Sequence, residues 1–311
     1  MLFHIRTRVL VAVALIILML GMSASFGISS QDERKSTSLE DEIPLLLTHS
    51  TITDIGFSAD SIYTNTTIAA GTYNGCAILE NQSMVCWGDN EYGQLGDGTT
   101  TGSAVPIYVN VAANETPVEV TVGQVTACAL MESGNIYCWG SGYYGKMGNG
   151  EPWNDDYVNT EMRQVLLPEG QGGQTVSISG GHICTILNNG DVYCWGRGNQ
   201  GQLGYGGTSN RNIPAKVNLP GQRSAIAIST GTFMTCAITN DGMGYCWGEN
   251  DEGQLGNGTT NSRQMTPAEV LFPSGNTPVS ISAGDDFACA LMDNRKVMCW
   301  GENNDGRLGQ G

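Results

Sequence analysis

Hydrophobic and β-branched residues recur along this chain in short runs separated by glycine-rich polar segments. Five of these runs end in glycine and have the length and composition of strands, and none has the 3.6-residue period of an amphipathic helix. They occupy residues 66–71, 119–123, 175–180, 225–231 and 278–284. The pattern therefore predicts a β protein with many short strands and tight turns.

All ten cysteines fall into one recurring pattern, C-x9-C-W-G-x4-G-[QKR]-[LM]-G-x-G. Successive copies start 52, 56, 52 and 53 residues apart, and none contains an insertion or deletion. The copies begin at Cys76, Cys128, Cys184, Cys236 and Cys289. A repeat of about 50 residues cannot bury both faces of a sheet alone, so the copies must stack on one another.

Each repeat predicts four short strands. These are an outer strand, an inner strand that ends in glycine, a strand that begins at the first cysteine and a strand that ends in Cys-Trp-Gly. The outer strand usually has proline at its second position, which suits an edge because proline cannot donate to a ladder. These segments are residues 43–45, 105–107, 213–215 and 266–268, with 161–163 as the copy that lacks proline. Radial stacking of such units gives a β-propeller.

The repeat resembles the regulator-of-chromosome-condensation (RCC1) repeat, whose Trp-Gly and Gly-Gln-Leu-Gly-x-Gly signatures are present at residues 87–98 and in the other copies. The resemblance covers residues 43–311. It implies a β-propeller, usually of seven blades, which binds proteins through loops at its rim. Partners in the family range from a small nuclear GTPase to secreted enzymes that the propeller inhibits.

Five copies of the repeat leave two alternatives for the number of blades. In one, a strand near residues 43–47 completes the last blade, and a ring of five four-stranded blades has no open edge. In the other, the sequence is a fragment of a seven-blade ring that lacks two repeats. The family resemblance favours the second alternative.

The N-terminal residues have the three-part form of a secretory signal. Arg6 and Arg8 precede an apolar run of 14 residues, Val9 to Met22, and small residues follow it. We predict a signal peptide or membrane anchor over residues 1–26, a polar linker over 27–42 and the propeller over 43–311. The protein is thus expected to be secreted, or anchored to the outer face of the cell membrane by an uncleaved N-terminal segment.

An exported protein is expected to form disulfides. A three-residue loop such as 80–82 would place Cys76 opposite Cys86 on adjacent antiparallel strands, within disulfide distance. We therefore predict five bonds, each within one repeat, and prefer them to free thiols or a zinc site. The predicted pairs are Cys76 with Cys86, Cys128 with Cys138, Cys184 with Cys194, Cys236 with Cys246, and Cys289 with Cys299.

The charge of the chain opposes nucleic-acid binding. The sequence has 14 basic and 30 acidic residues, and without Arg6 and Arg8 the charge of residues 27–311 is 12 minus 30, or −18. Such a surface repels phosphate. A protein partner of unknown identity is expected instead, with the chain itself a monomer.

An insertion in the second repeat is the candidate binding loop, because loops on a regular scaffold commonly carry function. Its aromatic and acidic residues are Trp153, Asp155, Asp156 and Tyr157. The tryptophans that follow the second cysteine of each repeat are interpreted as packing between blades, in preference to a carbohydrate-binding stripe. The sequons at Asn65, Asn81 and Asn114 are predicted glycosylation sites, and a fourth, at Asn257, lies within the repeat turn.

The sequence contains no constellation that predicts catalysis. His182 precedes Cys184 and is interpreted as a packing residue, and no cluster of histidines predicts a metal site. The acidic loops 89–91 and 249–252 do not match a calcium-binding pattern. We expect no cofactor, and we predict a non-catalytic protein-binding propeller that could inhibit another extracellular protein. The alternatives are guanine-nucleotide exchange with chromatin contact, which the signal segment and charge oppose, and an extracellular enzyme acting on polysaccharide.

Overall fold

The computed structural model describes residues 68–152, 158–260 and 263–310. All of them belong to the unit Ser50–Gly311, and the unit Met1–His49 contains no described residue. The predicted signal segment, the linker and the first outer strand, residues 43–47, therefore lie outside the described residues. In the part of the chain that is described, no helix is long and apolar enough to cross a membrane.

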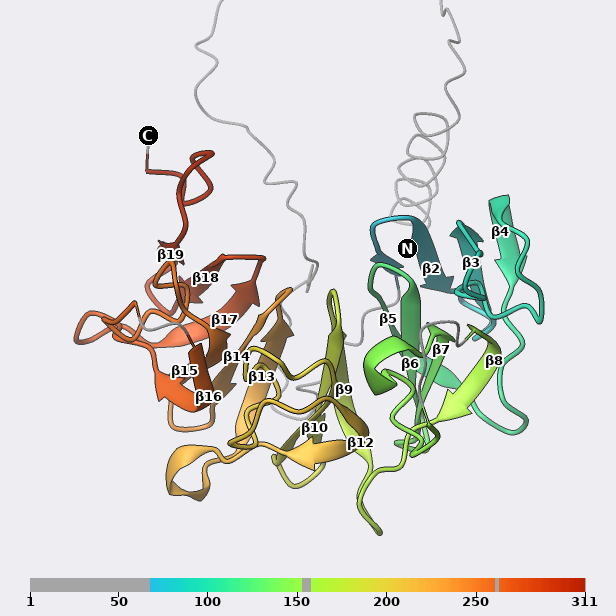
Figure 1. The fold of residues 1–311 in the computed structure, drawn as a ribbon, viewed down its shortest axis with the longest axis horizontal. Helices are drawn as coiled ribbons and strands as arrows, with labels where there is room; N and C mark the ends of the chain where they lie inside the picture. Colours follow the sequence, from blue (N-terminus) through green and yellow to red (C-terminus); the bar gives the residue numbers. More distant parts are fainter. Residues whose placement is uncertain (1–67, 153–157, 261–262, 311) are drawn as a thin grey trace, which may run out of the picture. The chain divides into compact units, whose positions relative to one another are not determined.

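The described residues form five antiparallel sheets that follow one another along the chain (Figure 1). We number them sheets 1 to 5. Sheet 1 contains β1 (Ile68–Ala70), β2 (Asn74–Ile78), β3 (Met84–Gly88) and β4 (Ser103–Tyr108). Sheet 2 contains β5 (Pro117–Val122), β6 (Thr126–Met131), β7 (Ile136–Ser141) and β8 (Val158–Gln164).

Sheet 3 contains β9 (Gly173–Ile178), β10 (His182–Leu187), β11 (Val192–Gly196) and β12 (Arg211–Lys216). Sheet 4 contains β13 (Ala225–Thr230), β14 (Met234–Thr239), β15 (Gly244–Glu249) and β16 (Arg263–Glu269). Sheet 5 has three described strands, β17 (Pro278–Ala283), β18 (Phe287–Met292) and β19 (Val297–Gly301). Two short 3-10 turns, η1 (Tyr143–Gly145) and η2 (Pro220–Gln222), complete the described elements.

The predicted all-β propeller architecture is confirmed, and the sheets are out of phase with the sequence repeat by one strand. In sheets 1 to 4 the outer strand pairs with the Cys-Trp-Gly strand that precedes it along the chain. In sheet 1, for example, Ile107 of β4 lies opposite Cys86 of β3. An outer strand thus closes the sheet before it, while the loop after it leads to the inner strand of the next sheet.

Each predicted cysteine pair occupies directly opposite positions on the second and third strands of its sheet. Cys76 lies opposite Cys86 with a Cα–Cα distance of 4.1 Å, and the sulfur atoms are 2.07 Å apart. The turn between these strands is closed by Leu79, whose backbone N–H donates to the carbonyl of Ser83. The other four pairs have the same geometry, with S–S distances of 2.08–2.11 Å.

The repeated tryptophans fasten each sheet to the one before it. The indole N–H of Trp139 donates to the carbonyl of Gln94 at 2.9 Å, and that of Trp195 donates to the carbonyl of Lys146 at 2.8 Å. Trp247 and Trp300 make the same bond to Gln202 and Gln254. Trp139, Trp195 and Trp247 are fully buried and pack between blades, so the repeated tryptophans of the described residues do not form a stripe of exposed indole rings.

The hydrophobic core consists of a series of clusters, each of which spans two neighbouring sheets. The cluster around Trp139 combines Met84 and Leu95 from the first repeat with Val120 and Ala129 from the second. Three further clusters repeat this arrangement along the chain. Apolar burial therefore stabilises the contacts between sheets as well as each single sheet, as expected for a repeat protein.

Candidate protein-interaction surface

Two sets of loops lie at the same end of every sheet. The second strand begins where the third strand ends, because the two are antiparallel and in register. In sheet 3 His182 lies opposite Gly196, and in sheet 5 Phe287 lies opposite Gly301. The loops that enter the second strand and the loops that leave the third strand therefore share one surface, which we call the loop face.

An arginine sandwiched between two aromatic rings occupies the loop face of sheets 3 and 4. The guanidinium carbon of Arg197 lies 5.1 Å from the ring centroid of Tyr144 and 4.7 Å from that of Phe233. Its Nε donates to Asn199 at 2.7 Å. Tyr144 has a φ of 65°, a conformation that is uncommon for a residue other than glycine and often marks a functional position. The three side chains form a preorganised stack, each from a different repeat.

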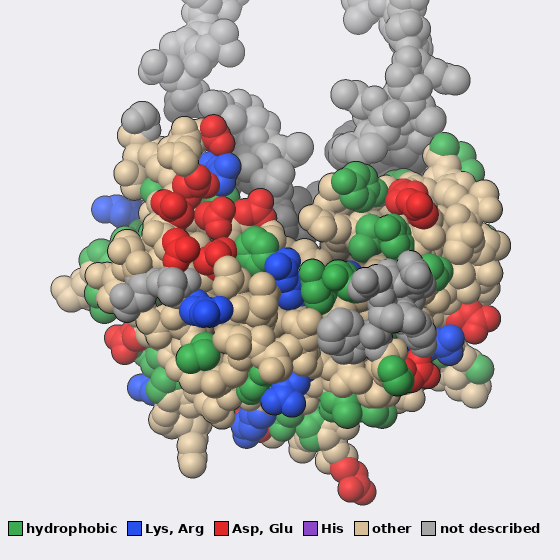
Figure 2. Space-filling model, viewed as in Figure 1, with side chains coloured by type: hydrophobic (Ala, Val, Ile, Leu, Met, Phe, Trp, Pro, Cys, Tyr) green, Lys and Arg blue, Asp and Glu red, His purple; other side chains and the backbone are tan. Residues whose placement is uncertain are grey.

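Acidic side chains gather next to this stack, over the loops of sheets 4 and 5 (Figure 2). The group consists of Glu249, Asp251, Glu252, Asp285, Asp286, Glu302 and Asp305, and we call it the acidic group. Its basic neighbours are Arg197 and Arg307. Negative charge therefore dominates this part of the surface.

Burial and mutual repulsion raise the pKa of two carboxyls in the acidic group. The pKa of Glu249 is raised by partial burial first, and then by the charges of Asp286 and Asp251. The pKa of Asp286 is raised by partial burial and by Glu302 and Asp285, while the positive charge of Arg307 opposes the shift. A cationic group that approached this surface would relieve the repulsion.

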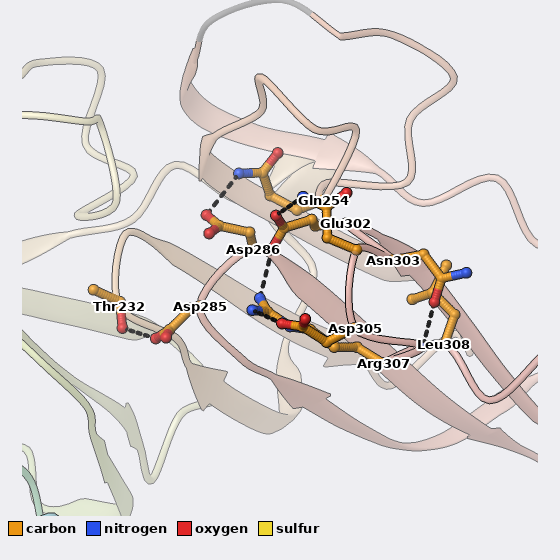
Figure 3. Close-up of polar contacts among 10 residues, drawn as sticks. Thr232, Gln254, Asp285, Asp286, Glu302, Asn303, Asp305, Arg307 and Leu308 are labelled. Carbon is orange, nitrogen blue, oxygen red and sulfur yellow. Dashed lines mark hydrogen bonds and ion pairs between the residues drawn. The ribbon is translucent and has the colours of Figure 1, made fainter.

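Hydrogen bonds within the loops hold the acidic group in place (Figure 3). Glu302 accepts from Arg307 and Asn304, each at 2.5 Å, and Arg307 also contacts Asp305 at 3.0 Å. Asp285 accepts from the hydroxyl of Thr232, which lies in the preceding repeat. The acidic group is thus part of the folded loops of two neighbouring repeats.

The asparagine of each acidic loop has a structural role. Asn90, Asn250 and Asn303 accept a hydrogen bond through Oδ1 from the backbone N–H of the leucine five residues later, at 2.8–3.1 Å. This bond shapes the glycine-rich turn. Among the described residues no group of three or more His, Cys, Asp or Glu side chains is arranged to hold a metal ion.

His182 lies beneath the loop face and is fully buried. Its Nε2 is 2.7 Å from the hydroxyl of Thr235, which in turn donates to the carbonyl of Gln202 at 2.9 Å. Burial, with the nearby charge of Arg197, lowers the pKa of His182 to about 3. A neutral, inaccessible imidazole of this kind joins sheets 3 and 4, which agrees with a packing role.

The binding loop predicted from the sequence, with Trp153, Asp155, Asp156 and Tyr157, lies outside the described residues. Only the start of the segment between β7 and β8, up to Pro152, is described, and it leaves β7 at the loop face. The sequons at Asn81 and Asn114 are exposed, whereas Asn65 lies outside the described residues.

Sequence reasoning missed the stack around Arg197, although the repeat contained a signal. The position two residues after the repeated tryptophan is Asp89, Ser141, Glu249 or Glu302 in the other copies, and only the third repeat has a base there. Comparison of equivalent positions between repeats would have singled out Arg197. Its aromatic neighbours come from adjacent repeats, so the stack itself could only be seen in the fold.

The RCC1 family model, described as the regulator of chromosome condensation (RCC1) repeat, matches residues 85–130, 189–238 and 241–291. A second model of the same description matches all five copies, at residues 66–94, 118–146, 174–202, 225–254 and 279–307. Together the matches cover more than half of the chain. This protein belongs to the RCC1-repeat family.

The chain is similar to a plant and a human protein whose names describe different activities. The chain is 32% identical over 244 residues to the ultraviolet-B receptor UVR8 of Arabidopsis thaliana, covering 78% of this chain and 54% of the receptor. It is 27% identical over 242 residues to the human E3 ubiquitin-protein ligase HERC2, covering 76% of this chain and 5% of the ligase. The chain thus spans about half of the receptor and a small part of the ligase.

Two solved structures have the same fold. Human WBSCR16 matches with a TM-score of 0.68 at 20% identity, covering 78% of this chain and 63% of that one. Yeast RCC1 (Prp20), solved in complex with Kap60, matches with a TM-score of 0.64 at 22% identity, covering 76% and 56%. At this identity the likeness shows the fold.

Proposed function

We propose that this RCC1-repeat protein is a non-catalytic protein-binding module that is secreted, or tethered to the outer face of the cell membrane. It engages a protein partner through the loop face and acts by occupying that partner, as an inhibitor of another extracellular protein would. The observation that carries the proposal is the Arg197 stack beside the acidic group.

The chemistry of the loop face supports protein recognition. Arginine and tyrosine are enriched among the residues that contribute most to protein–protein binding energy. Because the rings of Tyr144 and Phe233 already hold Arg197, little side-chain entropy is lost when a partner covers it. The acidic side chains around the stack then favour a partner with basic groups at the rim of the interface, and binding through them weakens with salt.

The cysteine pairs support the proposed location. All ten cysteines are within disulfides in the structure, and the described residues contain no free thiol. Such disulfides persist in oxidising compartments and are rare in the cytosol. Together with the signal-like residues 1–26, they favour export over an intracellular exchange factor.

Capture of partners by the immobilised, folded chain tests this function. We expect a partner from the extracellular fraction to bind the wild type and to be lost with Arg197→Ala. Arg223→Ala is the matched control, because Arg223 also stacks on an aromatic ring, that of Tyr245, but pairs with Asp241 in the hairpin turn between β14 and β15, away from the loop face. Equal capture by all three chains would contradict the proposed surface. An exported protein whose mass still includes residues 1–26 would identify an anchor in place of a signal peptide.

A further inference from the structure

The hairpin turns at the end of the sheets opposite the loop face usually contact the next sheet. In sheets 2, 3 and 4 the turn between the second and third strands contains a glycine with a φ of 80–84°, which packs against the segment that leads into the next sheet. These glycines are Gly134, Gly190 and Gly242. The carbonyls of the first two accept from the N–H groups of Gly173 and Ala225, at 2.8 and 2.9 Å. The chain itself therefore closes these junctions.

The junction between sheets 1 and 2 lacks this contact. Gln82 occupies the turn position of the glycines, with a φ of 67°, and Pro117 occupies the position of Gly173 but has no N–H to donate. Proline is also present at the junction of sheets 4 and 5, as Pro278, but there the turn keeps its glycine. A glutamine in the left-handed region is strained, and such residues gather at functional positions.

An open pocket with a volume of about 400 Å³ lies at this junction. Met84, Val109, Val111 and Pro117 provide its apolar lining, and the first two are only 1% and 7% exposed. Gln82 lines the pocket from the hairpin turn. The volume is in the range of sites that hold small molecules, roughly 300–1,000 Å³. The pocket therefore forms where the turn and the next sheet do not close on each other.

The polar lining of the pocket favours a neutral ligand. Glu115 is its charged residue, and no basic residue lines it. The carboxylate of Glu115 already accepts from Ser133 and Asn135 at 2.7 Å and from Tyr137 at 3.3 Å. Slight burial raises the pKa of Glu115, but these three hydrogen bonds outweigh it and the pKa is lowered, so the group stays ionised at neutral pH. An anion is repelled, and the carboxylate is engaged by neutral donors, so the carboxamides and hydroxyls around it suit a molecule rich in hydroxyl groups.

One wall of the pocket is the sequon Asn81-Gln82-Ser83. The Oδ1 of Asn81 accepts from the N–H of Ser83 at 3.1 Å and from its hydroxyl at 2.6 Å. The Nδ2 of Asn81, which is the atom that carries the sugar in N-glycosylation, makes no hydrogen bond among the described residues, and Asn81 is exposed. Asn114, in the second described sequon at this end of the sheets, is also exposed but does not line the pocket.

We propose that an N-linked glycan on Asn81 places its first sugar in this pocket, where the sugar takes the place of the contact that glycine makes at the other junctions. In the covalent step, Nδ2 of Asn81 attacks C1 of a lipid-diphosphate-linked saccharide, the bond between C1 and the diphosphate oxygen breaks, the lipid diphosphate leaves, and Nδ2 loses one proton. The apolar face of the sugar covers Val111 and Pro117, and its hydroxyls bond to Gln82 and Thr116. This inference rests on the proposed export of the protein and gives the glycan a structural role away from the loop face.

The test compares the full chain from a secretory host that attaches N-linked glycans with the full chain from a host that attaches none. Peptide mapping by mass should find the sugar on Asn81. Asn81→Asp removes the glycan but keeps the acceptor for Ser83, and it should lower the midpoint of thermal unfolding by roughly 2–4 °C in the first host only. Asn114→Asp is the matched control, because it removes the other sequon with the same change of charge and aspartate tolerates the φ of 63° there. It should have no effect that depends on the host.

Two further comparisons examine the pocket itself. Enzymatic trimming of the glycan to its first sugar should leave the midpoint of the wild type unchanged, because only that sugar lies in the pocket. The double variant Gln82→Gly with Pro117→Ala copies the junction of Gly190 and Ala225, so it should close the pocket and unfold at the same temperature with and without the glycan.

Four results would overturn the proposal. These are an exported chain without a sugar on Asn81, an equal effect of Asn81→Asp in both hosts, a midpoint that falls on trimming to the first sugar, and a double variant that still depends on the glycan. None of these measurements involves the loop face. A chain that is exported, captures its partner and loses that partner with Arg197→Ala would therefore keep the proposed function even if Asn81 carried no sugar.

Discussion

The indole N–H of Trp195 donates to the backbone carbonyl of Lys146, 2.8 Å away in the preceding repeat. Both groups are buried, so neither can exchange this bond for one with water. The bond therefore links the folding of one repeat to that of the next.

Trp195→Phe should lower the free energy of unfolding by about 1–3 kcal/mol, because it removes the donor and leaves a buried carbonyl unsatisfied. Trp87→Phe is the control. Trp87 is only partly buried, and its indole makes no such bond among the described residues. Urea denaturation of the two variants checks the prediction, and equal losses would contradict it.

Gly148→Ala should destabilise the protein more than Gly309→Ala, by roughly 1–3 kcal/mol. Both glycines have a positive φ, 65° and 63°, so both substitutions introduce similar backbone strain. A Cβ on Gly148 would lie 2.8 Å from Nε1 of Trp195, whereas a Cβ on Gly309 would meet nothing within 4 Å. Thermal unfolding of both variants measures the difference, and a larger effect at Gly309 would rule out the clash.

Removal of one disulfide should cost about 2–4 kcal/mol in the chain-entropy model. All five pairs have a sequence separation of 10, so that model predicts the same loss for each. Cys184 and Cys194 are fully buried, whereas Cys289 and Cys299 are partly exposed. Replacing the first pair by alanine should therefore cost more, through lost packing, than replacing the second. Chemical denaturation of the two variants compares these losses in the free energy of unfolding. In the wild type, the intact mass should rise by the mass of ten hydrogens on reduction, which counts the five disulfides.

Glu119 should make stability depend on pH. Burial raises its pKa to about 7 from a usual value of 4.5, although Thr175 and the N–H of Val176 donate to it. The unfolded chain loses this proton at lower pH than the folded chain does. The contribution of Glu119 to stability is therefore greatest below pH 4.5, decreases as the pH rises to about 7 and is then level, with a total change of up to about 3 kcal/mol.

Glu119→Gln should remove this fall in stability between pH 4.5 and 7. The free energy of unfolding is measured across that range for both chains. An unchanged slope in the variant would show that another group is responsible.

The sequence predicted the features that depend on contacts within a repeat. The spacing of Cys76 and Cys86, with a three-residue loop between their strands, was enough to place them opposite each other. The five copies and their glycine-rich turns were likewise visible in the pattern of residues, and the predicted fold is confirmed.

Features that depend on contacts between repeats were not predicted. Glu119 lies in a strand of otherwise ordinary pattern, and its hydrogen bonds to Thr175 and Val176 come from β9 of the next sheet. The partners of Arg197 come from loops more than 30 residues away in each direction. The assignment of the outer strand to the preceding sheet was implied only by the five-blade alternative, in which a strand near residues 43–47 completes the last blade, because the cysteine pattern alone does not say which neighbour the outer strand joins.

Each repeat carries both halves of the tryptophan-to-carbonyl contact, with the indole on its third strand and the acceptor carbonyl in the turn that follows. A duplicated copy inserted between two existing repeats would bring a donor for the turn before it and an acceptor for the indole after it. Gene duplication could therefore lengthen this protein without compensating substitutions in the neighbouring repeats.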